Sequence, residues 1–245
     1  MRHIWFCLPI VLAIAIMTIV ATGLAATDPV ATRPAVKIPA YMKGLDPKGL
    51  GKPEDIVRRR WTAVMNVLRE KKVDQKIKIS RVKEIVSPIF DFRTMALLSL
   101  GKTNWRKFST AQQTEFSALF IERLKESYGR RISDYGGEQV AFKPALPLKT
   151  RKSSKTPAKA TDGPRIVHVP VEIASKTRKW IVLHKFRKVG EVYRIYDIEI
   201  EGISILRSYR SQFNDILVRG KPEDLLVRLR KPLPAPPAAK GGPRS

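Results

Sequence analysis

Apolar residues recur at helical spacing through the first patterned part of the chain. Pro53-Glu54-Asp55 begins a helix, with a proline and two acids in its first turn. Shorter helices are predicted over residues 80–86 and from Ser87-Pro88 to Gly101. Ser109-Thr110-Ala111-Gln112 has the form of a capping box and begins a long helix. One face of that helix is apolar and carries Phe116, Leu119, Phe120, Leu124 and Tyr128.

The period changes to two after Gly136-Gly137, which predicts strands. A short strand over residues 138–144 comes before three longer ones, over residues 165–175, 179–186 and 192–200. Pro170 predicts an edge position or a bulge. Helical spacing returns after Gly202. The order of helices, strands and helices predicts an α+β fold, with a four-stranded, antiparallel, curved sheet between N-terminal and C-terminal helices.

Three further segments lack such periodicity. Residues 27–52 are rich in Pro, Gly and Ala and are predicted to form a flexible leader. Residues 231–245 are predicted to form a disordered Pro/Ala tail. Residues 148–165 form a basic, low-complexity loop between two strands. Its composition fits either a solvated linker or an arm that contacts phosphates or a membrane.

The N-terminus predicts export. Arg2 is followed by an apolar run without charge and then by small residues, as in a secretory signal peptide over residues 1–26, with cleavage near Ala25 or Ala26. The run exceeds the usual apolar length of about 7–15 residues, so an uncleaved membrane anchor is the alternative. Cys7 is the only cysteine and lies within the run. A cleaved chain therefore excludes disulfides, cysteine-bound zinc and thiol catalysis.

Charge narrows the class of partner. The chain has 245 residues, with 47 basic and 22 acidic ones, for a formal net charge of +25. Such an excess predicts an anionic partner: nucleic acid, lipid head groups or an acidic protein. An exported protein meets lipid phosphates in the cell envelope, which favours a lipid surface over nucleic acid.

Candidate catalytic groups are few. Asp197, Glu199 and Glu201 alternate along one strand and share a face, about 6.6 Å apart in sequence order. Paired carboxylates serve glycosidases, but neighbouring Lys and Arg offer a simpler role, so we interpret the three as the solvent side of the strand. His168 and His184 have no partner at a motif spacing. The sequence predicts no metal site and no enzymatic activity.

Two blocks of sequence resemble the MlaC/toluene-tolerance family of periplasmic phospholipid-binding proteins. The first block carries Asp91-Phe92, Leu100-Gly101, Trp105, the helix start from Ser109 to Phe120, Tyr128 and Tyr135. The second carries Tyr196-Asp197, Glu201-Gly202-Ile203-Ser204 and Tyr209-Arg210-Ser211-Gln212-Phe213. The resemblance extends from Pro53 to Arg230 and implies a lipid-binding domain over residues 53–230.

The resemblance implies a monomeric carrier in the periplasm, without a cofactor, that holds phospholipid in an apolar cavity between sheet and helices. It also implies shuttling between an outer-membrane lipoprotein complex and an inner-membrane MCE-type/ABC transporter complex, which maintains outer-membrane lipid asymmetry. The loop over residues 148–165 and the tail depart from the family pattern. Two alternatives stay open: a carrier of the hopanoid-associated subgroup, and a membrane-anchored envelope interaction protein.

Residues of the candidate lipid contact come from the apolar faces of the predicted helices and strands. The same residue types line pockets for apolar ligands and ordinary cores, so the pattern alone does not separate a cavity from a core. The candidates are Phe92, Met95, Phe116, Phe120, Leu124, Val169, Val171, Ile198, Ile200, Tyr209 and Phe213.

Overall fold

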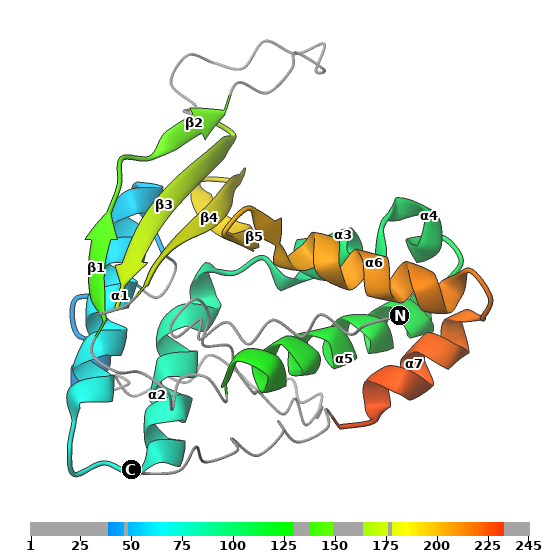
Figure 1. The fold of residues 1–245 in the computed structure, drawn as a ribbon, viewed down its shortest axis with the longest axis horizontal. Coiled ribbons are helices and arrows are strands. Elements are labelled where there is room, and N and C mark those ends of the chain that lie inside the picture. The colour runs from blue at the N-terminus through cyan, green and yellow to red at the C-terminus, as the bar shows by residue number, and fades with distance from the viewer. Residues whose placement is uncertain (1–38, 47–48, 130–137, 149–163, 176–177, 233–245) are drawn as a thin grey trace, which may run out of the picture.

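A computed structural model describes residues 39–46, 49–129, 138–148, 164–175 and 178–232 (Figure 1). The expected signal peptide, Gly136-Gly137 and nearly all of the basic loop and of the Pro/Ala tail lie outside these residues. The elements in chain order are η1 (Ala40–Met42), α1 (Pro53–Arg69), α2 (Gln75–Val86), η2 (Ser87–Ile89), α3 (Phe92–Leu100), α4 (Lys102–Trp105), α5 (Thr110–Gly129), β1 (Gln139–Phe142), β2 (Leu146–Leu148), β3 (Ile166–Ala174), β4 (Lys179–Val189), β5 (Val192–Ile200), β6 (Ile203–Ser204), α6 (Ile205–Leu217) and α7 (Pro222–Arg230).

Helices α1 and α2 pack together and hold the end of the expected leader. Residues 39–46 do not behave as free chain, because Tyr41, Met42 and Leu45 pack against a small apolar cluster between the two helices. Arg60 on α1 is buried and donates hydrogen bonds to the carbonyls of Ile85, at 2.6 Å, and Asp46. Helical periodicity places Arg60 off the apolar stripe, but these two carbonyls give its guanidinium a buried polar site.

The helix predicted from Ser87 is broken at Phe90. The short helix η2 ends there, and Phe90 forms a parallel bridge with Ile195 of the sheet. Asp91 then caps α3, because its side chain accepts a hydrogen bond from the backbone N–H of Thr94 at 3.0 Å. The Asp91 N–H itself donates to the carbonyl of Ile195 at 2.8 Å. The break therefore attaches the start of α3 to the sheet.

The predicted capping box at the start of α5 is present. Gln112 donates its backbone N–H to Ser109 Oγ at 3.2 Å, and the Gln112 side chain accepts from the Ser109 N–H at 3.0 Å. Both bonds satisfy N–H groups that the first helical turn leaves without a partner. A local sequence pattern is sufficient to specify this helix start.

Ser109→Ala is expected to lower the free energy of unfolding by about 1 kcal/mol, because the N-cap oxygen is lost. Ser117→Ala on the same helix is the matched control, since its hydroxyl only donates to the Gln113 carbonyl within the helix. Urea unfolding followed by circular dichroism compares the two. Equal loss of stability in both variants would contradict a role for the cap.

The α+β fold with an antiparallel sheet is confirmed, and two short strands extend the predicted sheet. All the pairings within the six-stranded sheet are antiparallel, in the order β1-β3-β4-β5-β6, with β2 also paired to β3. Strands β5 and β6 are joined by Glu201 and Gly202, both with positive φ, 51° and 79°. Glycine at the second of these positions suits such a two-residue turn.

Pro170 lies on β3, which is an interior strand and not an edge. Its neighbours on one side are β1, which pairs as far as Val171, and β2, which pairs from His168. Pro170 therefore sits where that side of β3 passes from one short strand to the next. Its missing N–H costs no ladder hydrogen bond at this interruption.

One face of the sheet, the inner face, is apolar. On β3 every second residue is buried, from Val167 to Ile173, as the alternation predicts. On β4, Trp180 and Val182 are buried on this face. Ile181 lies on the opposite face of the sheet and is 54% exposed. The remaining inner residues of β4 are His184 and Phe186.

A bulge in β5 changes the predicted inner face. Lys185 pairs with Asp197 and Phe186 pairs with Ile195, so Tyr196 is an extra residue without a partner. Ile195 consequently joins Ile198 and Ile200 among the buried residues of the sheet. A strict period of two would place Tyr196 on the inner face with Ile198 and Ile200, but that period does not continue across the bulge.

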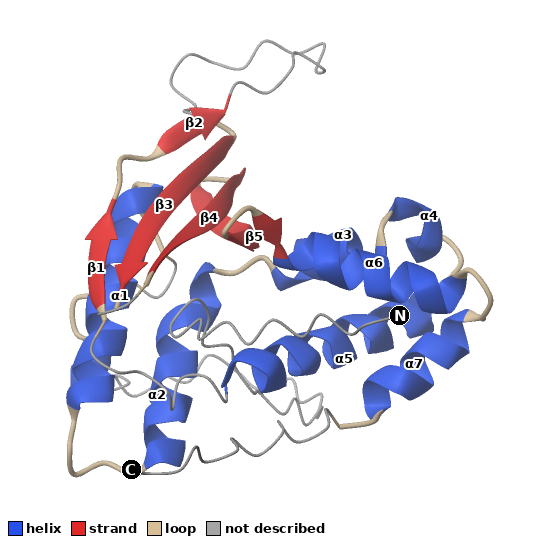
Figure 2. Ribbon diagram, viewed as in Figure 1, coloured by secondary structure: helices blue, strands red, loops and turns tan. Residues whose placement is uncertain are grey.

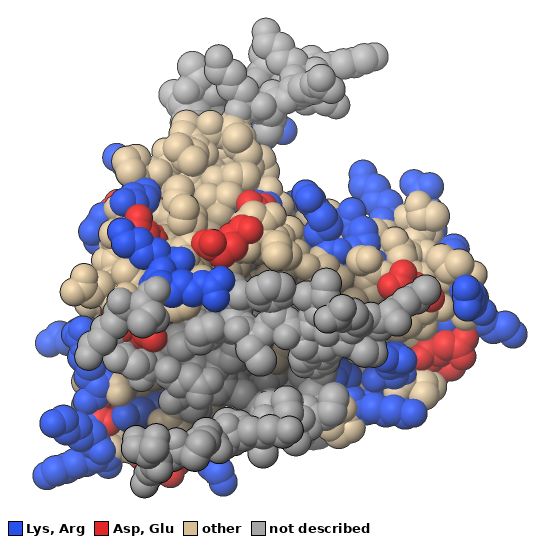
Figure 3. Space-filling model, viewed as in Figure 1, with Lys and Arg blue, Asp and Glu red and all other residues tan. Residues whose placement is uncertain are grey.

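The sheet with α1 beside it and a separate group of helices form two parts of the molecule (Figures 1 and 2). Helix α1 lies beside β1 and β3, while α3, α5, α6 and α7 pack against one another on the other side. Helices α3 and α6 connect the two parts through contacts with β5. Among the described helices, none is both long enough and apolar enough to cross a membrane. On the face drawn in Figure 3, Lys and Arg cover more of the described surface than Asp and Glu do.

Candidate functional site

The candidate residues from the strands all lie on the buried inner face of the sheet. Val169, Val171 and Ile198 have no exposed surface, and Ile200 is nearly buried. Val169 pairs with His184, which in turn pairs with Ile198, so these positions form one row across three strands. The structure thus brings together the side chains that alternation had placed on separate predicted strands.

The candidate residues from the helices form an aromatic group. Phe116 and Phe120 stack with ring centroids 5.9 Å apart, and Phe213 meets Phe116 edge to face at 5.5 Å. Tyr209 meets Phe120 edge to face at 5.2 Å and places its hydroxyl 3.2 Å from Ser127 Oγ. Such contacts fix the relative positions of α5 and α6. Met95 and Leu124 are fully buried beside them.

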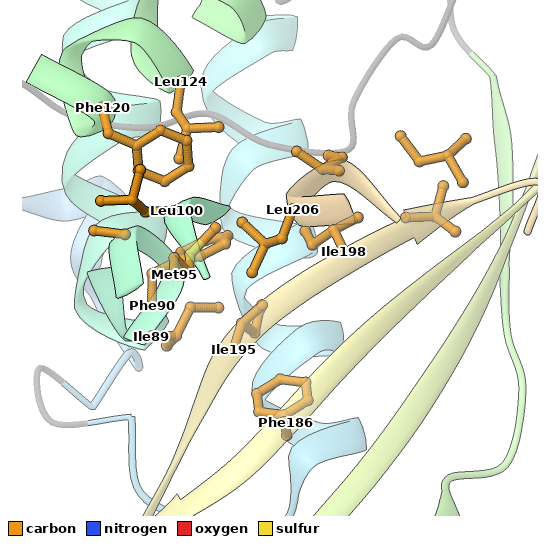
Figure 4. Packing of buried hydrophobic residues seen from close by; sticks show 14 of the residues in the cluster. Ile89, Phe90, Met95, Leu100, Phe120, Leu124, Phe186, Ile195, Ile198 and Leu206 are labelled. Carbon is orange, nitrogen blue, oxygen red and sulfur yellow. The ribbon is translucent and has the colours of Figure 1, made fainter. Parts of the chain in front are cut away.

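The two groups belong to one apolar cluster. Figure 4 shows Phe120, Leu124 and Met95 on the helical side and Ile195 and Ile198 on the sheet, with Leu206 between them. Phe92 is the candidate at the margin, because it is only partly buried and stacks on Phe90 at 5.6 Å. Other cluster members were not among the sequence candidates, although their apolar character is visible in the sequence: Phe186, Ile195 and Leu206.

Asp91 and Asp197 attach the helices of this cluster to the sheet. Asp91 Oδ2 lies 2.6 Å from Arg187 Nε of β4, while Oδ1 caps α3. Asp197 accepts hydrogen bonds from Ser204 Oγ at 2.8 Å and from the backbone N–H of Leu206 at 3.3 Å. Carboxylates at helix N-termini are favoured by the free N–H groups and by the helix dipole. The motif residues Asp91 and Asp197 therefore position α3 and α6.

The Leu100-Gly101 motif also has a positioning role. Gly101 ends α3 with a φ of 79°, a conformation that suits glycine, and a Cβ there would lie 3.5 Å from Arg210. Arg210 of α6 donates from Nε to the carbonyl of Leu98 at 2.8 Å. The end of α3 is thus satisfied by a side chain from α6.

The three carboxylates of β5 and its turn are engaged in structure and do not form an open acid pair. Asp197 is buried, which corrects its expected place on the solvent side. Lys185 Nζ lies 3.2 Å from Asp197 and 2.7 Å from Glu199. Burial alone would lower the pKa of Lys185, but these carboxylates raise it. Glu201 accepts from the Ile181 N–H at 2.6 Å.

The two histidines of the sheet lie on opposite faces. His184 is buried on the inner face, where burial lowers its pKa to about 4, while the Val169 backbone acts in the opposite direction. The pKa of His168, which lies on the other face, is lowered by burial and by nearby Lys185. Within the described ranges, no group of three or more His, Cys, Asp or Glu side chains could hold a metal ion.

Comparisons with known proteins identify a matching family model, a similar sequence and a similar fold. The family model described as MlaC protein matches residues 58–231. The toluene tolerance protein ttg2D of Pseudomonas putida is 21% identical over 171 residues, which cover 68% of this chain and 74% of that protein. A phospholipid-binding protein from Ralstonia solanacearum, solved in complex with a phospholipid, matches with a TM-score of 0.59 at 18% identity, over 74% of this chain and 96% of that one. The structural match shows a shared fold.

Proposed function

The chain belongs to the MlaC family, and from this premise we propose that it is a phospholipid carrier without enzymatic activity. The observation that carries the proposal is the inner face of the sheet, an apolar surface that faces an aromatic group of helices. The fold match to a protein solved with a phospholipid supports the same ligand class. Acyl chains would lie between the sheet and α3, α5 and α6.

The energetics of such a site favour acyl chains. Removing each CH₂ from water is worth about 0.8 kcal/mol, so a lipid leaves a bilayer only for a surface that is equally dry. Valine and isoleucine side chains of the inner face supply that surface. The residues proposed to contact the chains are those given by the sequence, from Phe92 to Phe213, together with Ile195 and Leu206.

The proposal also includes a periplasmic location and membrane complexes as partners. The predicted signal peptide supports a periplasmic location, with the lipid-binding domain over residues 53–230 following the leader. The excess of basic residues, +25 overall, favours contact with anionic lipid head groups. Exchange with an outer-membrane lipoprotein complex and an inner-membrane MCE-type/ABC transporter requires that each partner favour a conformation with lower lipid affinity.

Native mass spectrometry of the protein purified from cells tests the proposal. We expect co-purified phospholipid, identified by its mass and head group after release. Val171→Phe, which enlarges a side chain on the inner face, should lower the lipid-bound fraction severalfold. The matched control is Ile181→Phe, since Ile181 is 54% exposed on the opposite face.

Two results would contradict the proposal. A protein that is purified without bound lipid under non-denaturing conditions, and that takes up no lipid from vesicles, is not a phospholipid carrier. Equal lipid occupancy in the Val171→Phe and Ile181→Phe variants would place the ligand away from the inner face. Recovery of a polycyclic lipid in place of a diacyl phospholipid would instead support the hopanoid-associated alternative.

A further inference from the structure

The inner face of the sheet contains one central polar side chain. His184 lies between Val169 of β3 and Ile198 of β5, and both neighbours are fully buried and apolar. His184 is 7% exposed, and its Nδ1 atom has no hydrogen-bond partner. Leaving a buried polar atom unpaired is unfavourable, and native proteins rarely do so without a ligand, a water or a functional reason.

A second unpaired nitrogen on this face does not explain the first. Trp180 Nε1 is also buried without a partner, but it lies four residues earlier on β4. Four residues of a strand span about 13 Å, too far for one small polar group to meet both nitrogens. Trp180 also lies at the start of β4, with the Arg178 guanidinium 5.9 Å from its ring. His184 is therefore the polar group at the centre of the face.

The surroundings of His184 select the chemistry of its partner. With a pKa near 4, the imidazole is neutral at physiological pH and offers no positive charge to a phosphate. The buried residues of β3, β4 and β5 include no Lys or Arg. A charged head group would be costly here, whereas a neutral oxygen that forms a hydrogen bond would satisfy the ring nitrogen.

We propose that His184 is a specificity-determining residue that donates a hydrogen bond from Nδ1 to an ester carbonyl of the bound phospholipid. The inference rests on the proposed lipid-carrier function. Within the apolar part of a diacyl phospholipid, the ester carbonyls are the hydrogen-bond acceptors. The contact lets the protein distinguish an acyl ester from a plain hydrocarbon chain, and places the glycerol end of the chains over the centre of the sheet.

The test compares two lipids that differ only in these carbonyls. Delipidated full-length protein is offered vesicles of dipalmitoyl phosphatidylglycerol or of its dihexadecyl ether analogue, and the bound lipid is quantified. The wild-type protein should favour the diester about three- to tenfold, as one hydrogen bond allows. His184→Leu should bring the ratio of the two affinities close to one. The matched control, His168→Leu on the opposite face, should keep the wild-type ratio.

Imidazole signals provide a second measurement that does not require the His184→Leu variant to fold. The chain has three histidines, so protein labelled with ¹⁵N only in histidine gives few signals. One histidine should differ between the diester-loaded and diether-loaded protein, and the His168→Leu variant should retain this difference. Identical spectra, or a preference for the diester that survives His184→Leu, would overturn the proposal. Failure of the wild-type protein to bind either lipid would instead refute the carrier function itself.

Discussion

Replacing Asp197 by alanine is expected to lower the free energy of unfolding by about 3–5 kcal/mol. The carboxylate is buried and accepts hydrogen bonds from Lys185, Ser204 and the Leu206 N–H, so its loss removes partners from a half-buried ammonium and from the first turn of α6. Urea unfolding of delipidated protein measures the effect, since bound lipid would add its own stabilisation. Loss of α6 packing should also reduce lipid uptake, because Leu206 belongs to the apolar cluster.

Two further substitutions separate this role from a general loss of negative charge. Glu201→Ala should cost about 1 kcal/mol, because Glu201 is exposed and accepts one hydrogen bond, from the Ile181 N–H. The loss of unfolding free energy in Asp197→Asn should lie between those of Asp197→Ala and Glu201→Ala. The amide keeps an acceptor for Ser204 but not the charge opposite Lys185. If Asp197→Ala and Glu201→Ala lose equal stability, the buried network is not what holds α6.

Acid is expected to destabilise the folded protein through His184. Its pKa is about 4 in the folded state because of burial, whereas an unfolded chain has a value near about 6.5. The unfolded state therefore takes up the proton first as the pH falls, and stability declines from pH 6.5 towards pH 4. Between pH 7 and pH 5 this single group should remove about 2 kcal/mol. Above about pH 7.5, one unit beyond the pKa of the unfolded chain, it should contribute almost no pH dependence.

His184→Met tests the assignment, because methionine does not titrate and suits an apolar face. Urea unfolding of the delipidated wild type and variant at pH 7, 6 and 5 gives the comparison, in a range above the ordinary pKa of most carboxylates. The gap between wild type and variant should shift by about 2 kcal/mol from pH 7 to pH 5 in favour of the variant. His168 titrates with the same sign in both proteins and cancels. Parallel pH profiles would show that His184 is not the group responsible.

Short-range sequence patterns predicted much of the fold. The capping box of Ser109 and Gln112 depends on residues three apart, so its hydrogen bonds are readable from the sequence. The alternation from Val167 to Ile173 likewise identified the buried side of β3. The candidate lipid contacts on α5 and on β3 followed from these two periods. Whether they enclose a ligand stays a prediction, because core and pocket residues are alike in character.

Other features depend on partners that lie far away along the chain. The bulge at Tyr196 arises from how β5 pairs with β4, and it replaced Tyr196 with Ile195 on the inner face. Arg60 is buried because two carbonyls from distant segments accept its hydrogen bonds. Periodicity in one segment contains no information about such pairings.

The sequence by itself determined the helix starts, the strand alternation, the α+β order and the family. Each of these depends on neighbouring residues or on the two blocks of sequence that resemble the family. Only the tertiary structure decided that Asp197 is buried and accepts a hydrogen bond from the first turn of α6, and that His184 faces the apolar side of the sheet. The physical reason is that strand register and burial are set by long-range packing, which decides whether a polar side chain meets water, a partner or an apolar surface.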